Sequence, residues 1–225
     1  MNLVGILKMT KILNLYAGIG GNRKLWDNVT NIEVTAVEYD EAIAEAYKDR
    51  YPTDTVIVGD AKQYLLDNYK NFDFIWASPP CQSHSAIRKC KVDCRPNNKG
   101  TTKAIYADMS LYQIILFLQH HVKNGKWLVE NVKPYYEPLI KPNVEIDRHF
   151  YWCNFNIEKI KVTKKIIIEN AKISDLADFD INAYKDIKNK RQVIRNQVDY
   201  DVGKHILDSA LIDGFSTPKQ GGLFD

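Results

Sequence analysis

The first 80 residues alternate short apolar runs with segments of helical periodicity. Apolar runs of this length, bounded by turn residues, predict buried strands, and the segments between them predict amphipathic helices. The expected strands cover residues 11–15, 33–38, 55–58 and 72–77, and the expected helices cover residues 21–28, 40–50 and 61–69. This βαβα order predicts an α/β fold with a doubly wound, mainly parallel sheet and helices on both faces. In such sheets ligands bind beyond the carboxyl ends of the strands.

The pattern is less regular after residue 82. A polar segment over residues 82–106 is long for a loop, which predicts a functional or mobile segment. Asp108 is expected to cap a helix that runs to about residue 122. Further expected elements are strands at 127–130 and 148–155, a partner strand at 161–168 and a helix at 201–212.

This pattern divides the chain into four parts. We expect a main α/β domain (1–155), a short insert region (156–192), a C-terminal helix that returns to the main domain (193–213) and a disordered tail (214–225). The insert region and the returning helix together form a small, reduced C-terminal lobe.

Composition is that of a soluble globular protein: 45% of the 225 residues are hydrophobic and 26% are charged. No apolar run is long enough to span a bilayer and no secretory signal is evident, so we expect a cytoplasmic protein without a membrane partner. Disulfides are therefore not expected. Cys90 and Cys94 lie four apart but lack a second ligand pair, so no metal site is predicted.

Net charge is only +3, but the cations are unevenly distributed. Between residues 86 and 104, only Asp93 opposes six cations, which are Arg88, Lys89, Lys91, Arg95, Lys99 and Lys103. Such a segment is either a solvated loop or a contact surface for nucleic-acid phosphates.

A glycine-rich turn follows the first expected strand, with the sequence Tyr16-Ala17-Gly18-Ile19-Gly20-Gly21. Glycines at this point let the backbone approach a ligand closely. Arg23 stands where a dinucleotide fingerprint needs its third glycine, which disfavours a pyrophosphate. Glu38 and Asp60 end the next two strands, where they can accept hydrogen bonds from a ribose and an adenine amine. Together they indicate an adenosine cofactor such as S-adenosylmethionine; a tight turn with helix-capping acids is the alternative.

Two strand ends carry candidate chemistry. Ser78-Pro79-Pro80 fixes the backbone after one strand and projects Cys81, a nucleophile once it is ionised. Glu130 ends the strand that begins near residue 127, and a carboxyl group there can act as a general acid. A buried structural thiol is the alternative for Cys81, but it suits Cys153 better.

The ordered motifs NLYAGIGG, VEYD, GDA, SPPCQS, ENV, RHFYW and RNQV resemble those of the DNA cytosine-5 methyltransferase family. The resemblance covers residues 11–211, except for the region around 155–190. It implies a cytosine C5-methyltransferase that uses S-adenosylmethionine, acts on double-stranded DNA and flips its target base out of the duplex. Such an enzyme works in a prokaryotic or phage-infected cell, often within a restriction-modification system.

The resemblance also implies roles for single residues. Cys81 would attack carbon 6 of the cytosine, Glu130 would hold N3 and the amine, Arg148 would contact the base carbonyl, and Asn131 would support the pocket. The implied cofactor contacts are Tyr16, Ala17, Gly18, Gly20, Gly21, Glu38, Tyr39, Asp60, Ala61, Pro80, Asn196 and Val198. The implied DNA contacts are Gln82, Ser85, Arg88, Lys89, Lys91 and Arg95.

Three features depart from the family pattern. Position 150 is Phe150 where a second arginine is usual, and the sequence does not say whether His149 compensates. The late motif reads Arg195-Asn196 instead of Gly-Asn. The few dozen residues between Phe155 and Arg191 are too few for the usual target-recognition domain, which predicts short or relaxed sequence specificity.

Other readings stay open. A tRNA-methylating branch shares these motifs, so RNA cytosine is an alternative substrate. A non-catalytic DNA-binding or regulatory subunit is a third alternative, which an intact Cys81 and Glu130 disfavour. At the C-terminus, Gln220 followed by Leu223-Phe224 resembles the peptide that docks on bacterial sliding clamps; a chance pair in a tail is the alternative.

Overall fold

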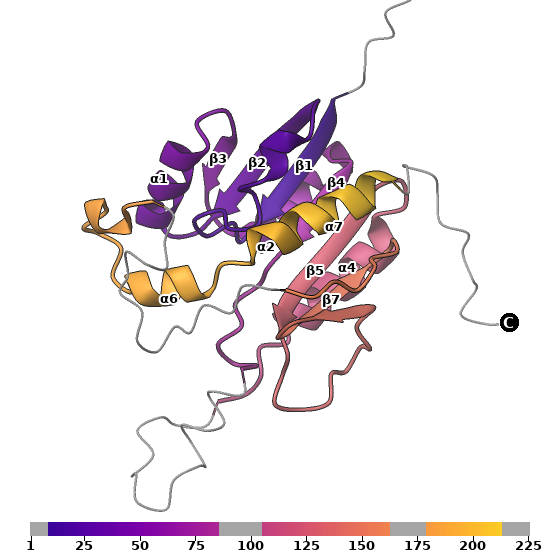
Figure 1. Cartoon of the computed structure of the whole chain (residues 1–225). Coiled ribbons are helices and arrows are strands. Elements are labelled where there is room, and N and C mark those ends of the chain that lie inside the picture. The colour runs from indigo at the N-terminus through magenta and orange to yellow at the C-terminus, as the bar shows by residue number, and fades with distance from the viewer. Residues whose placement is uncertain (1–8, 86–104, 163–178, 213–225) are drawn as a thin grey trace, which may run out of the picture.

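A computed structural model describes residues 9–85, 105–162 and 179–212 (Figure 1). The strands are β1 (Thr10–Leu15), β2 (Ile32–Glu38), β3 (Thr55–Val58), β4 (Phe74–Ala77), β5 (Lys126–Val132), β6 (Val144–Ile146) and β7 (His149–Cys153). The helices are α1 (Glu41–Arg50), α2 (Ala61–Asn68), α4 (Ser110–His121), α6 (Lys190–Arg195) and α7 (Tyr200–Ile212). Short 3₁₀ turns are η1 (Trp26–Asn28), η2 (Tyr69–Asn71) and η3 (Ile181–Ala183).

The strands form one sheet in the order β3-β2-β1-β4-β5-β7-β6. The pairs among β1 to β5 are parallel, whereas β7 runs antiparallel to both β5 and β6. This confirms the predicted doubly wound, mainly parallel α/β fold. The strand order reverses at β1, whose neighbours are β2 and β4, so the carboxyl ends of these strands form the expected ligand crevice.

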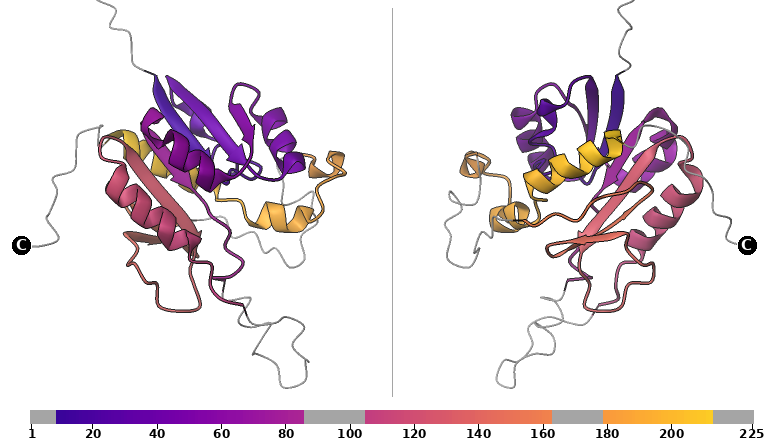
Figure 2. Two further views of the ribbon diagram at one scale, coloured as in Figure 1. Left: turned by 180° about the vertical axis from the view of Figure 1, so that it is seen from behind. Right: turned by 45° about the vertical axis from the view of Figure 1, so that its right-hand side comes forward.

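Successive residues of β1 point to opposite faces of the sheet and join different hydrophobic clusters. Leu13 packs with the buried faces of α2 and α4, while Ile12 packs with α7. Figures 1 and 2 show α7 on one face of the sheet and α4 on the other. The central strands are thus covered on both faces, which explains why their sequences are continuous apolar runs.

The helix expected at residues 21–28 does not form; the segment is a series of turns that ends in η1. Tertiary contacts override the local periodicity here. The Trp26 indole donates to the carbonyl of Gly203 at 3.1 Å, and the side chain of Arg23 reaches Asp54. The backbone of Gly203 lies so close to Asn22 that a Cβ at position 203 would stand 2.4 Å from the carbonyl oxygen of Asn22.

The described strand partners of β7 are β5 and β6, and neither was the expected one. Residues 161 and 162 form no strand, and residues 163–168 of the expected partner lie outside the described part. Asp147, with φ +52°, forms the tight turn between β6 and β7. β6 has three residues, too few to show a period of two in the sequence.

The segment from Phe179 to Ile194 packs on α1 and on the glycine turn. Ile181, Ile187 and Ile194 form a cluster with Ile19 and Ala46. The Tyr184 hydroxyl donates to Asp49 of α1 at 2.9 Å. The proposed domain boundaries remain a prediction, but these contacts tie residues 179–194 to the cofactor side of the sheet.

Candidate active site

One cavity of about 1070 Å³ opens at the carboxyl ends of β1, β2, β4 and β5. It collects most of the residues singled out from the sequence: Tyr16, Ala17, Gly18, Gly21, Glu38, Tyr39, Asp60, Ala61, Pro80, Cys81, Gln82, Ser85, Glu130, Asn131, Arg148, Asn196 and Val198. Gly20 is not part of its lining. The candidate DNA contacts Arg88, Lys89, Lys91 and Arg95 lie outside the described residues, as do Cys90 and Cys94.

The glycine turn has a left-handed backbone at three positions. φ is +57° at Tyr16, +54° at Gly18 and +73° at Gly20. A Cβ at Gly20 would stand 2.4 Å from the ring of Tyr51, whose hydroxyl donates to the Gly20 carbonyl at 2.7 Å. Gly20 is therefore needed for packing beneath the turn. A Cβ at Gly18 would meet nothing within 4 Å, so Gly18 faces open space in the cavity.

A buried ion pair supports the turn from below. Arg23 donates two hydrogen bonds of 2.8 Å to the Asp54 carboxylate, and Tyr47 donates a third at 2.8 Å. The side chains of Arg23 and Asp54 are each 3% exposed. The residue that replaces the third glycine of a dinucleotide fingerprint is thus a structural anchor. Sequence reasoning missed this role because Asp54 lies 31 residues away.

Glu38 and Asp60 are oriented by backbone amides at the ends of β2 and β3. Glu38 accepts from Gly18 N at 2.8 Å and Tyr39 N at 2.9 Å, and Asp60 caps α2 by accepting from Lys62 N at 2.7 Å. A carboxylate has about four acceptor positions, so both can still accept from a ligand hydroxyl or amine. Together with the open space at Gly18, this donor and acceptor set fits an adenosine cofactor.

Cys81 lies at the end of β4, in a turn closed by hydrogen bonds of 3.0 and 3.1 Å to its carbonyl oxygen from the amides of His84 and Ser85. The thiol is half-buried. Burial and the nearby charge of Glu130 raise the pKa of Cys81 above its ordinary value. The thiol is therefore protonated at rest. Loss of the negative charge on Glu130 would make its ionisation easier.

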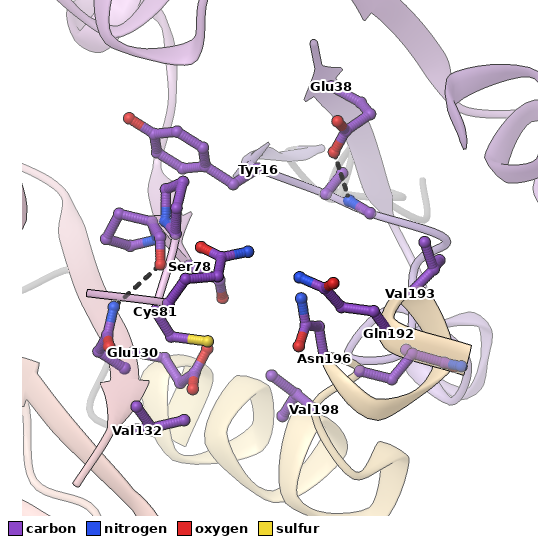
Figure 3. A pocket seen from close by; sticks show the side chains of 18 of the residues that line it. Tyr16, Glu38, Ser78, Cys81, Glu130, Val132, Gln192, Val193, Asn196 and Val198 are labelled. Atoms are coloured by element: carbon purple, nitrogen blue, oxygen red, sulfur yellow. Dashed lines mark hydrogen bonds between the residues drawn. The ribbon is translucent and has the colours of Figure 1, made fainter. Parts of the chain in front are cut away.

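Glu130 and Asn131 end β5 on the same side of the cavity as Cys81 (Figure 3). Both are buried, with exposed fractions of 6% and 1%. The Asn131 amide donates to the carbonyl of Pro79 at 2.9 Å, which joins the strand of Glu130 to the turn of Cys81. The structure thus brings together the nucleophile and the acid that the sequence predicts.

The turn between β6 and β7 completes this end of the cavity. Arg148 is exposed and donates to the carbonyl of Arg195 at 3.0 Å. His149 lies 3.5 Å from Glu130, measured from Nε2 to Oε1. Phe150 points to the opposite face, into the cluster that contains Trp152 and α4. His149 lines the site, although the sequence assigned it no role.

The opposite wall of the cavity comes from the C-terminal part of the chain. Figure 3 shows Gln192, Asn196 and Val198 across from Cys81. Asn196 and Val198 match the motif found in the sequence, while Gln192 was not predicted. Its element, α6, has only six residues, so its periodicity is too short to recognise.

The described residues were also compared with the requirements of a metal site and of a membrane-spanning helix. Within residues 9–85, 105–162 and 179–212, no group of three His, Cys, Asp or Glu side chains is placed to share a metal ion. No helix in these ranges has the length and apolar character needed to cross a bilayer.

The doubly wound fold and the donor and acceptor groups of the cavity are those of a protein that binds S-adenosylmethionine. The sequence model of the family described as C-5 cytosine-specific DNA methylase matches residues 10–133. The chain belongs to this family.

The chain is 29% identical over 150 residues to a tRNA (cytosine(38)-C(5))-methyltransferase from Spodoptera frugiperda. The aligned region covers 64% of this chain and 41% of that relative. A crystal structure of a Spodoptera frugiperda DNMT2 mutant matches with a TM-score of 0.38 and 28% identity, over 55% of this chain and 36% of that one. The structure of Entamoeba histolytica methyltransferase EhMeth matches with a TM-score of 0.41 and 17% identity, over 75% and 62%. The chain spans less than half the length of the curated relative.

Proposed function

We propose that this chain methylates carbon 5 of cytosine in DNA through a covalent intermediate on Cys81. The observation that carries the proposal is the shared cavity, in which Cys81 and Glu130 stand at one end and Gly18 with Glu38 at the other. Cytosine carbon 5 is a poor nucleophile until another group adds to the ring. A thiol and a carboxyl group beside a cofactor site are the groups that such an addition requires.

The reaction begins when the Cys81 thiol loses its proton to solvent and the thiolate forms a bond to carbon 6, while Glu130 gives a proton to N3. The ring becomes an enamine whose carbon 5 is nucleophilic. S-adenosylmethionine, when bound, supplies the methyl group. Loss of the carbon 5 proton to a base, followed by cleavage of the carbon–sulfur bond and return of the N3 proton to Glu130, regenerates the enzyme. Asn131 positions both protein groups through its bond to Pro79.

DNA is the leading substrate because the family that matches the chain is described as a C-5 cytosine-specific DNA methylase. The target base would be flipped out of the duplex, since ring atoms inside the stack cannot reach Cys81. Arg88, Lys89, Lys91 and Arg95, with Gln82 and Ser85, are the proposed DNA contacts. Tyr39, 80% exposed, is proposed to stack on the adenine of the cofactor.

RNA cytosine is the second candidate, because the similar curated relative is named as a tRNA methyltransferase. A non-catalytic regulatory role is the weakest alternative, since such a subunit has no need for a cysteine and a buried carboxyl group in one cavity. Restriction-modification, protection of phage DNA and a solitary methylase are biological settings that remain proposals.

The decisive experiment measures transfer of a labelled methyl group from S-adenosylmethionine to matched DNA duplexes and tRNA transcripts. We expect transfer to DNA, loss of transfer in Cys81→Ala, and a stable covalent adduct of wild type with duplexes that contain 5-fluorocytosine. Preference for tRNA would replace the leading substrate with the second candidate. Full activity of Cys81→Ala would refute the covalent mechanism.

Two partner proposals have separate tests. Bisulfite sequencing of methylated random-sequence DNA should show a short or relaxed site, and a long strict site read by this chain alone would contradict that expectation. Gln220, Leu223 and Phe224 lie outside the described residues. If they bind a sliding clamp, deletion of residues 220–225 should abolish co-precipitation with the clamp, and unchanged binding would refute the interaction.

A further inference from the structure

We propose that His149 is a positioning residue that shares a proton with Glu130 and thereby keeps Glu130 able to protonate cytosine N3. The inference rests on the proposed function of the same site. It extends that function by giving a role to a side chain that the motifs left unassigned.

The contact between the two side chains is specific. His149 Nε2 and Glu130 Oε1 are 3.5 Å apart, and their side chains are only 14% and 8% exposed. Both residues line the cavity that contains Cys81. Because little water reaches the pair, we expect a proton to exchange between His149 and Glu130 more readily than with solvent.

The sheet register explains why His149, and not its neighbours, occupies this position. β7 pairs antiparallel with β5, with Tyr151 opposite Glu130 and Phe150 opposite Asn131. Phe150 is buried among apolar side chains on the other face, and Arg148 donates a hydrogen bond to the carbonyl of Arg195. Among the described residues, His149 is the one whose side chain lies within ion-pair distance of Glu130.

The proton transfer balances without any other reactant. The pair holds one proton, either on His149 beside an ionised Glu130 or on Glu130 as a carboxylic acid beside a neutral imidazole. Because burial lowers the pKa of His149, the pair with the neutral imidazole and the carboxylic acid is favoured. The acid then gives this proton to N3 as the Cys81 thiolate adds to carbon 6. When the thiolate leaves, N3 returns the proton to Glu130, and the pair is restored.

Several charges act on the imidazole from the elements around it. Burial lowers the pKa of His149, as does Arg148 beside it, whereas Glu130 on β5 and Asp147 in the turn oppose this effect. The ring of Tyr151 lies 6.5 Å from that of His149, but its burial raises the pKa of the tyrosine hydroxyl, which stays neutral. At the same end of the cavity is the thiol of Cys81, whose pKa is raised by burial and by the Glu130 charge. A proton on the pair therefore also favours formation of the Cys81 thiolate.

The first test requires no substrate. The chain has five histidines, and the imidazole NMR signal that disappears in His149→Gln identifies His149. In Glu130→Gln the pKa of His149 should fall by ~1 pH unit, because the opposing carboxylate is lost. The four other imidazoles should titrate as in wild type. An unchanged titration of His149 would overturn the proposal, whatever the enzyme methylates.

The second test uses methyl transfer to the substrate established for the wild type. His149→Gln keeps a hydrogen-bond donor but cannot carry an exchangeable charge, so kcat should fall ~10-fold or more. The alkaline limb of the kcat profile should move to lower pH, because the imidazole no longer helps the site to retain its proton. Cofactor affinity should stay unchanged, and His120→Gln, an exposed change on α4, is the matched control. A His149→Gln enzyme with the wild-type pH profile would overturn the inference alone, whereas an inactive wild type would refute the proposed function.

Discussion

The side-chain amide of Asn131 donates to the carbonyl oxygen of Pro79 at 2.9 Å, across 52 residues of sequence. This bond fixes the end of β5, which carries Glu130, to the turn that carries Cys81. Both partners are buried, so water cannot replace the bond when it is lost.

Asn131→Ala should leave the Pro79 carbonyl without a donor and let the two strand ends separate. A buried acceptor left unsatisfied costs ~1–3 kcal/mol, so covalent trapping on 5-fluorocytosine DNA should slow by about 10- to 100-fold. Asn154→Ala is the control, because Asn154 makes comparable bonds to Gly125 and Trp127 at the other end of β5. Equal losses of trapping in both variants would show that Asn131 acts only through stability.

Cys81 should react slowly with iodoacetamide near neutral pH, because burial and the Glu130 charge raise its pKa. Alkylation should increase as pH rises through that pKa, since only the thiolate reacts. Glu130→Gln removes the negative charge, so its alkylation curve should shift to lower pH. Mass spectrometry of the peptide that contains Cys81 separates this thiol from the others. Cys153, whose pKa burial raises to about 11, should stay unmodified in the folded protein. A shift to higher pH in Glu130→Gln would contradict the electrostatic coupling.

Asp54→Asn should destabilise the fold strongly, because it removes the buried carboxylate that faces Arg23 and leaves only the exposed Asp27 to offset its charge. Removal of one member of a buried ion pair costs ~3–5 kcal/mol. Asp27→Asn is the matched control, since Asp27 pairs with the same arginine at 2.7 Å but its side chain is 67% exposed. That change should cost at most ~1 kcal/mol. Urea denaturation of both variants measures the difference, and similar midpoints would refute the role of Asp54.

Gly18→Ala and Gly20→Ala should fail in different ways. At Gly20, a left-handed φ combines with a Cβ position 2.4 Å from the Tyr51 ring, so the fold should lose ~2–4 kcal/mol of stability. At Gly18, φ is also left-handed but the space is open, so the fold should lose only ~1–2 kcal/mol. Its new methyl group enters the cavity, so S-adenosylmethionine affinity measured by calorimetry should fall clearly more than in Gly59→Ala. Unchanged cofactor affinity in Gly18→Ala would argue against this cofactor position.

The strands of the sheet were predictable from local pattern, while several other elements were not. β1, β2, β4 and β5 are apolar runs because each is covered on both faces, and this makes them visible in sequence. The helix expected at 21–28 does not form, because contacts to Asp54 and Gly203 fix the conformation of this segment and override its helical periodicity. β6 and α6 are too short to show a period at all.

The sequence by itself determined the class of fold and the chemistry at the strand ends. Parallel strands bring their carboxyl ends to one edge, so the βαβ order predicts Cys81 and Glu130 at the same edge of the sheet. Only the tertiary structure decided which side chain faces Glu130. In a strand, a shift of one residue moves each side chain to the other face, so the register of β7 against β5 selects His149 for the cavity and Phe150 for the core. That register depends on packing between distant segments, which no local pattern encodes.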